Sequence, residues 1–323
     1  MPETNTMGSE AAQEGSPHVS DSRLERVLRA SHFAVCGELG PPQSASADVI
    51  VRKSQHFRGY ADAVNLTDNQ TAVVRMSSIA AAKLCIDQGL EPVIQMTCRD
   101  RNRIAIQSDI LGAAALGIRN VLCLSGDHQS MGNHPQAKCV HDLDSIQLVG
   151  ALRRMRDESV FICGDETKNP ARMFIAAACN PFGDPYEARV HRLAKKVAVG
   201  ADFIQTQAIY DMGKFRHFMG LVRDRGLHQR VFILAGILPV KSAKALVFMR
   251  NNVAGMSIPD DLIDRMKGAE NPEEEGIKLA IEQVQELRQI EGVAGVHIMP
   301  ALWEAAFPRI VEGAGLLPRP EVA

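Results

Sequence analysis

The sequence predicts an α/β protein that folds as a single (β/α)8 TIM barrel. Short apolar runs, typical of buried parallel strands, alternate with longer segments of helical periodicity, and eight such units follow one another. Gly follows several of the helical segments, as expected where a helix ends; these residues are Gly89, Gly117, Gly200 and Gly226. The length of 323 residues suits one such barrel with a tail, since the typical barrel has about 250 residues.

An open doubly wound sheet is the alternative arrangement of the same units. No G-x-G-x-x-G follows the first predicted strand, and the chain contains no G-x-x-x-x-G-K-[ST]. The closed barrel is therefore favoured.

The predicted domains are a disordered leader at residues 1–21 and a barrel domain at residues 22–323. The leader is rich in Ser, Glu, Gly and Pro and lacks the apolar centre of a signal peptide. The hydrophobic share of 46% suffices for a large core, and no apolar run is long enough to span a bilayer. The net charge of −2, with scattered charged residues, gives no reason to expect nucleic acid or an anionic membrane as a partner. Seven cysteines without a Cys-x-x-Cys pair predict a reducing, cytoplasmic compartment.

Each predicted strand is an apolar run that ends at turn-forming or polar residues. The strands are expected at residues 33–39, 61–66, 90–97, 121–124, 172–178, 202–206, 230–235 and 293–298. The helices are expected where apolar residues recur at helical spacing, at residues 22–31, 48–57, 75–88, 103–116, 142–156, 186–199, 212–225, 241–250, 260–267, 272–289 and 302–312. Residues 128–141 are predicted to form a flexible loop over the active face, and residues 160–168 a Gly-containing insertion.

Two carboxylates stand at strand ends, where ligands bind in α/β proteins. Asp127 follows the apolar run 121–124 directly after Ser125 and Gly126, and the alternative reading is a turn or helix-capping residue. Glu38 precedes Gly40-Pro41-Pro42, which cannot continue a strand. A buried Glu can act as a general acid when its pKa is raised, and the alternative is a solvated or ion-paired residue at the barrel rim.

The predicted strand ends carry carboxylates and neutral hydrogen-bonding groups but no Lys, which argues against a Schiff-base aldolase. They are Glu38, Thr67, Asp68, Thr97, Arg99, Asp127, Asn180, Gln207 and, as a further candidate, His297. A divalent metal held by Glu38, Asp68 and Asp127 is an alternative, but we expect no metal. The three His of the 128–141 loop have spacings that fit no closed zinc pattern. The residues alone thus predict a barrel enzyme with acid–base chemistry on a small molecule.

Several strand-end motifs occur together and in order. They are Glu38-x-Gly40-Pro41-Pro42, Asn65-Leu66-Thr67-Asp68, Met96-Thr97-Cys98-Arg99-Asp100, Gly126-Asp127, Thr206-Gln207 and Gly236-Ile237-Leu238-Pro239. With this set the chain resembles methylenetetrahydrofolate reductases over residues 33–318. The 142–145 stretch and the C-terminal half are similar to the short forms found in anaerobic one-carbon pathways.

The resemblance implies a flavin-containing barrel that reduces 5,10-methylenetetrahydrofolate to 5-methyltetrahydrofolate, a step of one-carbon metabolism and methionine biosynthesis. Glu38 would be the general acid and Asp127 would act near the flavin and the pterin. Gln207 would hydrogen-bond the folate, and Met249 stands where an aromatic commonly stacks on folate or nicotinamide. The implied cofactor-binding residues are Thr67, Asp68, Gln95, Gly126, Asp127, Asn180, Asp184, Lys195 and Lys196. FAD is the expected flavin and FMN its alternative. The implied electron donor is NAD(P)H or an electron-transfer partner subunit, and the protein is expected to form oligomers.

The chain departs from the family pattern at several of these positions. Ser125 replaces an Arg, Asn180-Pro181 replaces an aromatic-Pro pair, Asp184 replaces a His and Ala301 an Arg. Two alternatives therefore stay open. One is a flavin-free reductase that takes hydride directly from a nicotinamide, and the other is a non-catalytic folate-binding barrel subunit.

Overall fold

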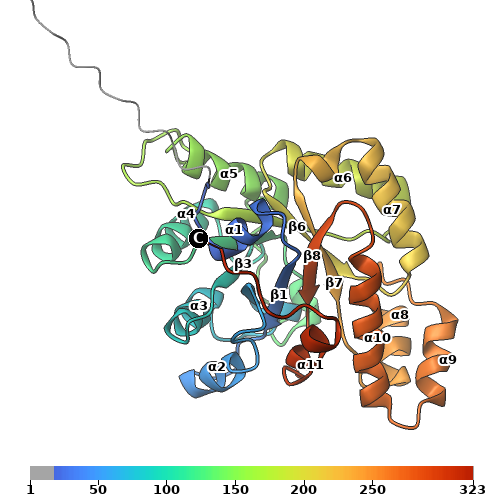
Figure 1. Cartoon of the computed structure of the whole chain (residues 1–323). Helices are drawn as coiled ribbons and strands as arrows, with labels where there is room; N and C mark the ends of the chain where they lie inside the picture. Colours follow the sequence, from blue (N-terminus) through green and yellow to red (C-terminus); the bar gives the residue numbers. More distant parts are fainter. Residues whose placement is uncertain (1–17, 323) are drawn as a thin grey trace, which may run out of the picture.

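The computed structural model describes residues 18–322, and within them eight parallel strands form a closed barrel with helices on its outside (Figure 1). The strands follow one another around the barrel in chain order, and β1 closes it by pairing with β8, with Cys36 opposite His297. The predicted (β/α)8 barrel is confirmed.

The strands and helices have the following bounds. The strands are β1 (Ala34–Leu39), β2 (Ala63–Leu66), β3 (Pro92–Thr97), β4 (Asn120–Leu124), β5 (Phe174–Cys179), β6 (Phe203–Ala208), β7 (Phe232–Ile237) and β8 (Val293–Ile298). The α-helices are α1 (Arg23–Arg29), α2 (Ala47–Ser54), α3 (Ser78–Asp87), α4 (Arg103–Ala115), α5 (Ser145–Asp157), α6 (Tyr186–Ala198), α7 (Met212–Asp224), α8 (Ala243–Asn252), α9 (Asp260–Gly268), α10 (Pro272–Leu287) and α11 (Ala306–Gly313). Three short 3-10 turns are η1 (Gln70–Ala72), η2 (Gln129–Met131) and η3 (Leu227–Gln229).

Three helices begin later than predicted because a polar residue caps each of them. The side chains of Ser77, Asp144 and Ser242 accept backbone N–H groups of the first turns of α3, α5 and α8. A capping residue has an extended backbone and stands outside the helix, so helical periodicity overestimates the length. The last helix, predicted from residue 302, begins at Ala306, because Leu302 has φ +55° and cannot be helical.

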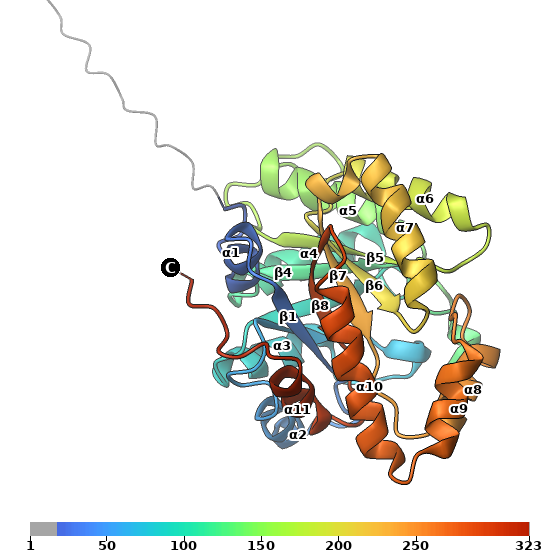
Figure 2. The same ribbon diagram turned by 45° about the vertical axis from the view of Figure 1, so that its right-hand side comes forward.

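The interior of the barrel changes from apolar to polar along its axis. Near the starts of the strands, inward side chains such as Cys36, Phe174 and Phe203 pack against Leu24 and Leu28 of α1. Helix α1 therefore closes the amino-terminal end of the barrel, beside the start of β1 (Figure 2). A second, larger cluster fills the space between strands and outer helices.

Two buried amides cross the middle of the barrel. Asn65 of β2 donates to Gln205 Oε1 at 2.6 Å, and Gln205 of β6 donates back to Asn65 Oδ1 at 3.0 Å. Both side chains are buried, and each satisfies the other. This pair separates the apolar end from the polar carboxyl-terminal end.

Most of the leader predicted at residues 1–21 lies outside the described residues, but residues 18–21 are described, and hydrogen bonds join them to α1 and to Arg119. The Ser20 N–H and hydroxyl both donate to Glu25 Oε2 at 2.8 Å. Arg119 donates to the Ser20 carbonyl at 2.9 Å. The buried Glu25 carboxylate thus orders a polar segment whose composition alone predicts disorder.

Candidate active site

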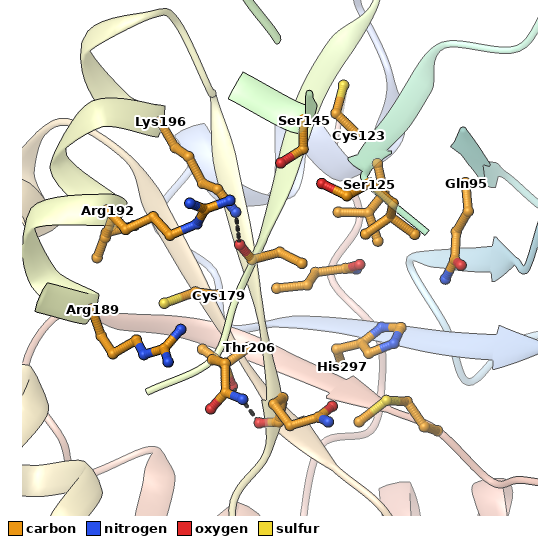
Figure 3. A pocket seen from close by; sticks show the side chains of 18 of the residues that line it. Gln95, Cys123, Ser125, Ser145, Cys179, Arg189, Arg192, Lys196, Thr206 and His297 are labelled. Carbon is orange, nitrogen blue, oxygen red and sulfur yellow. Dashed lines mark hydrogen bonds between the residues drawn. The ribbon is translucent and has the colours of Figure 1, made fainter. Parts of the chain in front are cut away.

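A cavity of about 390 Å³ opens at the carboxyl-terminal end of the barrel (Figure 3). We call it the barrel pocket. Its walls come from several strand ends and from α6, and its polar lining residues are Glu38, Gln95, Ser125, Ser145, Asn180, Arg189, Arg192, Lys196, Gln205, Thr206, Gln207 and His297. This is the end at which TIM barrels carry their chemistry.

Glu38 points into the barrel pocket from the penultimate position of β1. Gln95 Nε2 donates to Glu38 Oε2 at 3.1 Å, and His297 Nε2 lies 3.3 Å from the same oxygen. Glu38 Oε1 has no hydrogen bond within residues 18–322, and 22% of the Glu38 side chain is exposed. One carboxyl oxygen is therefore held by β3 and β8, and the other is available to a ligand.

His297 is almost entirely buried beside Glu38. Its side chain is 4% exposed, and its Nδ1 is buried without a hydrogen-bond partner among the described residues. Only Nε2 has a hydrogen-bonding partner, so a His297 that carries its proton on Nε2 would donate a hydrogen bond to the Glu38 carboxylate.

The opposite wall of the barrel pocket is cationic. Arg189, Arg192 and Lys196 are spaced three and four residues apart, so one face of α6 presents them together (Figure 3). Lys196 is buried and donates to the Ala178 carbonyl, and burial lowers the pKa of this Lys196. Arg192 has no ion pair or side-chain hydrogen bond in the part of the chain that the structure describes, so its donors are available for an anion.

Apolar side chains complete the barrel pocket. Leu122, Leu124, Ala178 and Met299 line it between the acidic and the cationic walls. Cys179 also lines it, but burial raises the pKa of its thiol to about 11. The thiol is neutral near pH 7 and is not an activated nucleophile.

The structure brings six of the predicted residues together. The barrel pocket is lined by Glu38, Gln95, Asn180, Lys196, Gln207 and the further candidate His297. The others lie outside its lining: Thr67, Asp68, Thr97, Arg99, Gly126, Asp127, Asp184, Lys195 and Met249.

Asp127 fastens two loops instead of facing the barrel pocket. It is exposed, and its Oδ2 accepts the Thr71 N–H at 2.8 Å. The buried Arg99 donates to the Asp127 carbonyl at 3.0 Å and to the Asn69 carbonyl at 3.2 Å. Gly126, at φ +90°, turns the chain here, and a Cβ on it would lie 3.0 Å from the Cβ of Arg99.

Asp68 is engaged in a buried ion pair. Arg101 lies 2.6 Å from Asp68 Oδ2, and the same oxygen accepts the N–H and the hydroxyl of Thr97, both at 2.9 Å. Thr67 beside it is buried, and its hydroxyl oxygen has no partner among the described residues. Asp68 therefore holds the end of β3 in place.

The remaining predicted residues lie toward the surface. Lys195 is exposed on α6, and Asp184 is exposed in the loop that precedes this helix. Met249 of α8 packs in a satellite cluster with Leu246 of the same helix and Met266 of α9.

Sequence reasoning missed the two arginines of the cationic wall and the central amide Gln205. The spacing of Arg189, Arg192 and Lys196 was visible in the sequence, but such a row is usually a solvated helix face. Gln205 is two residues after Phe203, a member of the apolar cluster inside the barrel, so strand alternation could have placed it on the inner face.

Residues 18–322 contain no group of three or more His, Cys, Asp or Glu side chains that could hold a metal ion. All seven cysteines are free. No helix in the described residues combines the length and apolar character needed to cross a membrane.

The fold and the barrel pocket together define a TIM-barrel protein with a carboxyl group opposite a cationic wall, the layout of an enzyme site for an anionic small molecule. The family model "Methylenetetrahydrofolate reductase" matches residues 23–315. The chain belongs to this family of oxidoreductases.

Curated relatives agree with the family. Methylenetetrahydrofolate reductase 2 of Schizosaccharomyces pombe is 27% identical over 233 residues, which cover 69% of this chain and 36% of that protein. The probable NADPH-dependent reductase of Caenorhabditis elegans is 24% identical over 91% of this chain and 44% of its own length. A Pectobacterium carotovorum 5,10-methylenetetrahydrofolate reductase is 24% identical over 65% of this chain and 64% of its own length. The chain thus spans less than half the length of the two eukaryotic relatives.

A solved structure shares the fold. A Clostridium thermocellum protein, described as binding two copies of 5-methyl-5,6,7,8-tetrahydrofolic acid, superposes with a TM-score of 0.61 at 12% identity. The superposition covers 92% of this chain and 99% of that protein.

Proposed function

We propose that this protein reduces 5,10-methylenetetrahydrofolate to 5-methyltetrahydrofolate with a bound flavin, and that Glu38 is the general acid. The observation that carries this proposal is the Glu38 carboxyl group, held by Gln95 and His297 and open to the barrel pocket on its other oxygen. Family membership supplies the substrate, and the Clostridium neighbour's methyltetrahydrofolate supports a folate ligand.

The side chains of the barrel pocket fit a flavin. A flavin joins a flat, largely apolar ring system to a chain that bears phosphate. Leu122, Leu124 and Ala178 offer an apolar surface for the ring, and Arg192 and Lys196 offer positive charge for phosphate. We propose FAD, with FMN as the alternative, held by Gln95, Asn180 and Lys196 of the predicted set. The remaining predicted residues, Thr67, Asp68, Gly126, Asp127, Asp184 and Lys195, would act on it only through neighbouring groups.

The chemistry that Glu38 performs is a proton transfer to the folate. A protonated Glu38 gives its proton to the bridge nitrogen that leaves, and the carbon–nitrogen bond breaks with its electron pair on that nitrogen. The bridge carbon is then a cationic iminium carbon, which becomes a methyl group when it takes up hydride. The flavin supplies that hydride when it is bound and reduced.

The neighbours of Glu38 orient it for this step. Gln95 donates to Glu38 Oε2, so this oxygen acts as an acceptor. The proton of a protonated Glu38 would then be on Oε1, the oxygen that faces the ligand. Gln207, half-buried near the end of β6, lines the barrel pocket and would hydrogen-bond the folate ring. Met249 would contribute only if α8 shifts toward the barrel pocket, since Met249 of α8 packs in the cluster that contains Met266 of α9.

The electron donor proposed here is NAD(P)H, with partner subunits as the alternative source. We also propose that the protein is oligomeric and cytoplasmic, that it acts on a small molecule, and that it binds neither nucleic acid nor membrane. The seven free cysteines support a reducing compartment.

A reductase without flavin is the second candidate. The positions of Asp184 and Lys195 favour it, because neither of these predicted flavin-holding residues lines the barrel pocket. In that case hydride would come from the nicotinamide directly, and Glu38 would keep its role.

The test is the visible spectrum of the purified protein, followed by anaerobic addition of methyltetrahydrofolate. A flavin band that bleaches supports the proposal, and a band that does not bleach contradicts the folate reaction. Absence of the band after reconstitution with FAD and FMN, with folate-dependent NAD(P)H oxidation, would establish the flavin-free reaction.

The role of Glu38 is tested by Glu38→Gln, with Glu270→Gln in the exposed loop before α10 as the matched control. Glu38→Gln should lower the rate of folate reduction by about 10²–10⁴-fold, the range for loss of a general acid, and spare reduction of the flavin. Glu270→Gln should leave both half-reactions unchanged. Equal loss of both half-reactions in Glu38→Gln would show that Glu38 is not the acid.

A further inference from the structure

A second cavity, of about 320 Å³, lies at the amino-terminal ends of β5, β6 and β7. It is at the opposite end of the barrel from Glu38. Four arginines from three parts of the chain line it: Arg29 of α1, Arg153 and Arg156 of α5, and Arg230, two residues before β7. We call it the arginine pocket.

Most of the guanidinium donors in the arginine pocket are unused. Arg29 bonds Glu25 through Nε alone, at 2.7 Å, and Arg153 Nε lies 3.5 Å from Asp157 Oδ2. The terminal amino groups of both residues make no hydrogen bond within residues 18–322. Arg230 is exposed and has neither an ion pair nor a side-chain hydrogen bond in that part of the chain. Three guanidinium forks are therefore free to bind an acceptor.

Each carboxylate near the arginine pocket is already paired with an arginine of the chain. Asp202 lines it, but Arg156 pairs with Asp202, and the Ile175 N–H donates to the same carboxylate at 2.7 Å. Asp157 and Glu25 pair with the arginines on their own helices. Four guanidinium groups face three carboxylates, and the excess positive charge falls on Arg230.

His228 adds a further unsatisfied group. It lines the same cavity, and its Nδ1 is buried without a hydrogen-bond partner among the described residues. A buried polar nitrogen without a partner costs free energy, so a ligand that bonds it is favoured.

From this geometry we propose that the arginine pocket binds a phosphate group, either free phosphate or a small phosphate monoester. Guanidinium forks match the oxygens of phosphate with two parallel hydrogen bonds each, which Lys cannot do. The volume of the cavity, about 320 Å³, is near the lower limit for ligand pockets. A phosphate with a small organic group would therefore fill it.

Such a ligand would join three elements that close the barrel at this end. Arg29 lies on the helix that covers the barrel interior, Arg153 on α5, and Arg230 at the entry to β7. A ligand that binds only the folded chain raises its stability in proportion to the logarithm of ligand concentration over Kd. Phosphate bound in the arginine pocket should therefore stabilise the barrel from the end opposite Glu38.

The experiment is a thermal-unfolding titration of the full chain with sodium phosphate, at ionic strength held constant with sodium chloride. The wild type should show a rise in Tm that saturates with phosphate. The variant Arg153→Gln/Arg230→Gln should bind phosphate at least about tenfold more weakly, because two forks are lost. The variant Arg192→Gln, on the cationic wall of the barrel pocket, is the matched control and should keep the rise in Tm.

Each result decides the proposal. An unchanged response in the double variant, its loss in Arg192→Gln alone, or a wild-type response no larger than that to chloride would overturn it. If the double variant does not fold, Arg230→Gln replaces it, since Arg230 is exposed and unpaired in the described structure, and weaker binding is again required. A parallel titration with glycerol 3-phosphate separates the two sources: tighter binding than phosphate assigns the monoester, and equal or weaker binding assigns free phosphate.

Discussion

Removing one member of the Asn65–Gln205 amide pair should destabilise the protein more than removing both. In Asn65→Leu the buried Gln205 amide loses its acceptor and its donor, which were bonded at 2.6 and 3.0 Å. Two net hydrogen bonds are worth about 1 kcal/mol each, and a buried polar group left unsatisfied costs about 1–3 kcal/mol. We expect the free energy of unfolding to fall by about 2–4 kcal/mol in Asn65→Leu, and similarly in Gln205→Leu.

The double variant Asn65→Leu/Gln205→Leu should behave differently, because no polar group is then stranded in the centre of the barrel. Replacing both partners by apolar groups of similar shape is close to neutral, so the loss should stay below about 1.5 kcal/mol. Urea unfolding of the four proteins gives the coupling energy directly, provided that the m-values agree. Losses in the double variant that equal the sum of the single losses would refute the reasoning and would mean that water satisfies each amide alone.

Three further predictions concern single side chains. Burial lowers the pKa of Lys196, so this side chain loses its positive charge at a lower pH than an ordinary lysine. The affinity of the barrel pocket for an anionic ligand should therefore fall as the pH rises through that lowered pKa. In a binding titration, Lys196→Arg should remove this fall. Iodoacetamide at mildly alkaline pH should modify the exposed Cys163 before Cys179, whose thiol has a pKa of about 11, and mass spectrometry that finds Cys179 modified first would contradict this. Asp127→Ala should speed hydrogen exchange at the Thr71 amide by about tenfold, for a lost hydrogen bond of about 1.4 kcal/mol, whereas Asp127→Asn keeps an acceptor and should stay near the wild-type rate.

The strand-end rule predicted that Glu38 faces the ligand-binding end of the barrel, and Glu38 does line the barrel pocket, because the strand itself fixes the direction of the side chain. Glu38 is within β1, two positions after the inward Cys36, so alternation turns it into the barrel. The same applies to Gln95 within β3, whereas Gln207 lies where the register of β6 against β7 shifts, and alternation alone does not place it. Sequence periodicity is enough for Glu38 and Gln95, since strand type and register decide their orientation.

Asp127 lies outside the lining of the barrel pocket because β4 ends at Leu124, three residues earlier. Beyond the strand, the left-handed turn at Gly126 decides the direction, and it sends the carboxylate to the Thr71 N–H. No sequence period describes a loop, so its side chains are placed by contacts that only the folded chain creates.

The cationic wall of the barrel pocket depends on tertiary packing, which helical spacing alone does not predict. Arg192 and Lys196 are ordinary helix residues by spacing, and only the packing of α6 against β5 brings Lys196 to the Ala178 carbonyl. The order at residues 18–21 likewise depends on a long-range partner, because Arg119 reaches the Ser20 carbonyl.

The interior of the barrel explains how one chain can carry polar sites at both ends. Along β1 the inward residues run from Ala34 and Cys36 to Glu38, that is, from the cluster beneath α1 to the barrel pocket. The Asn65–Gln205 pair marks the change, and the apolar cluster that includes Cys36, Phe174 and Phe203 lies below it. This cluster lies between the charges of the arginine pocket and Glu38, so a ligand in the arginine pocket should leave Glu38 unchanged. Stability and chemistry can therefore change independently in this barrel, as the two ends of TIM barrels generally allow.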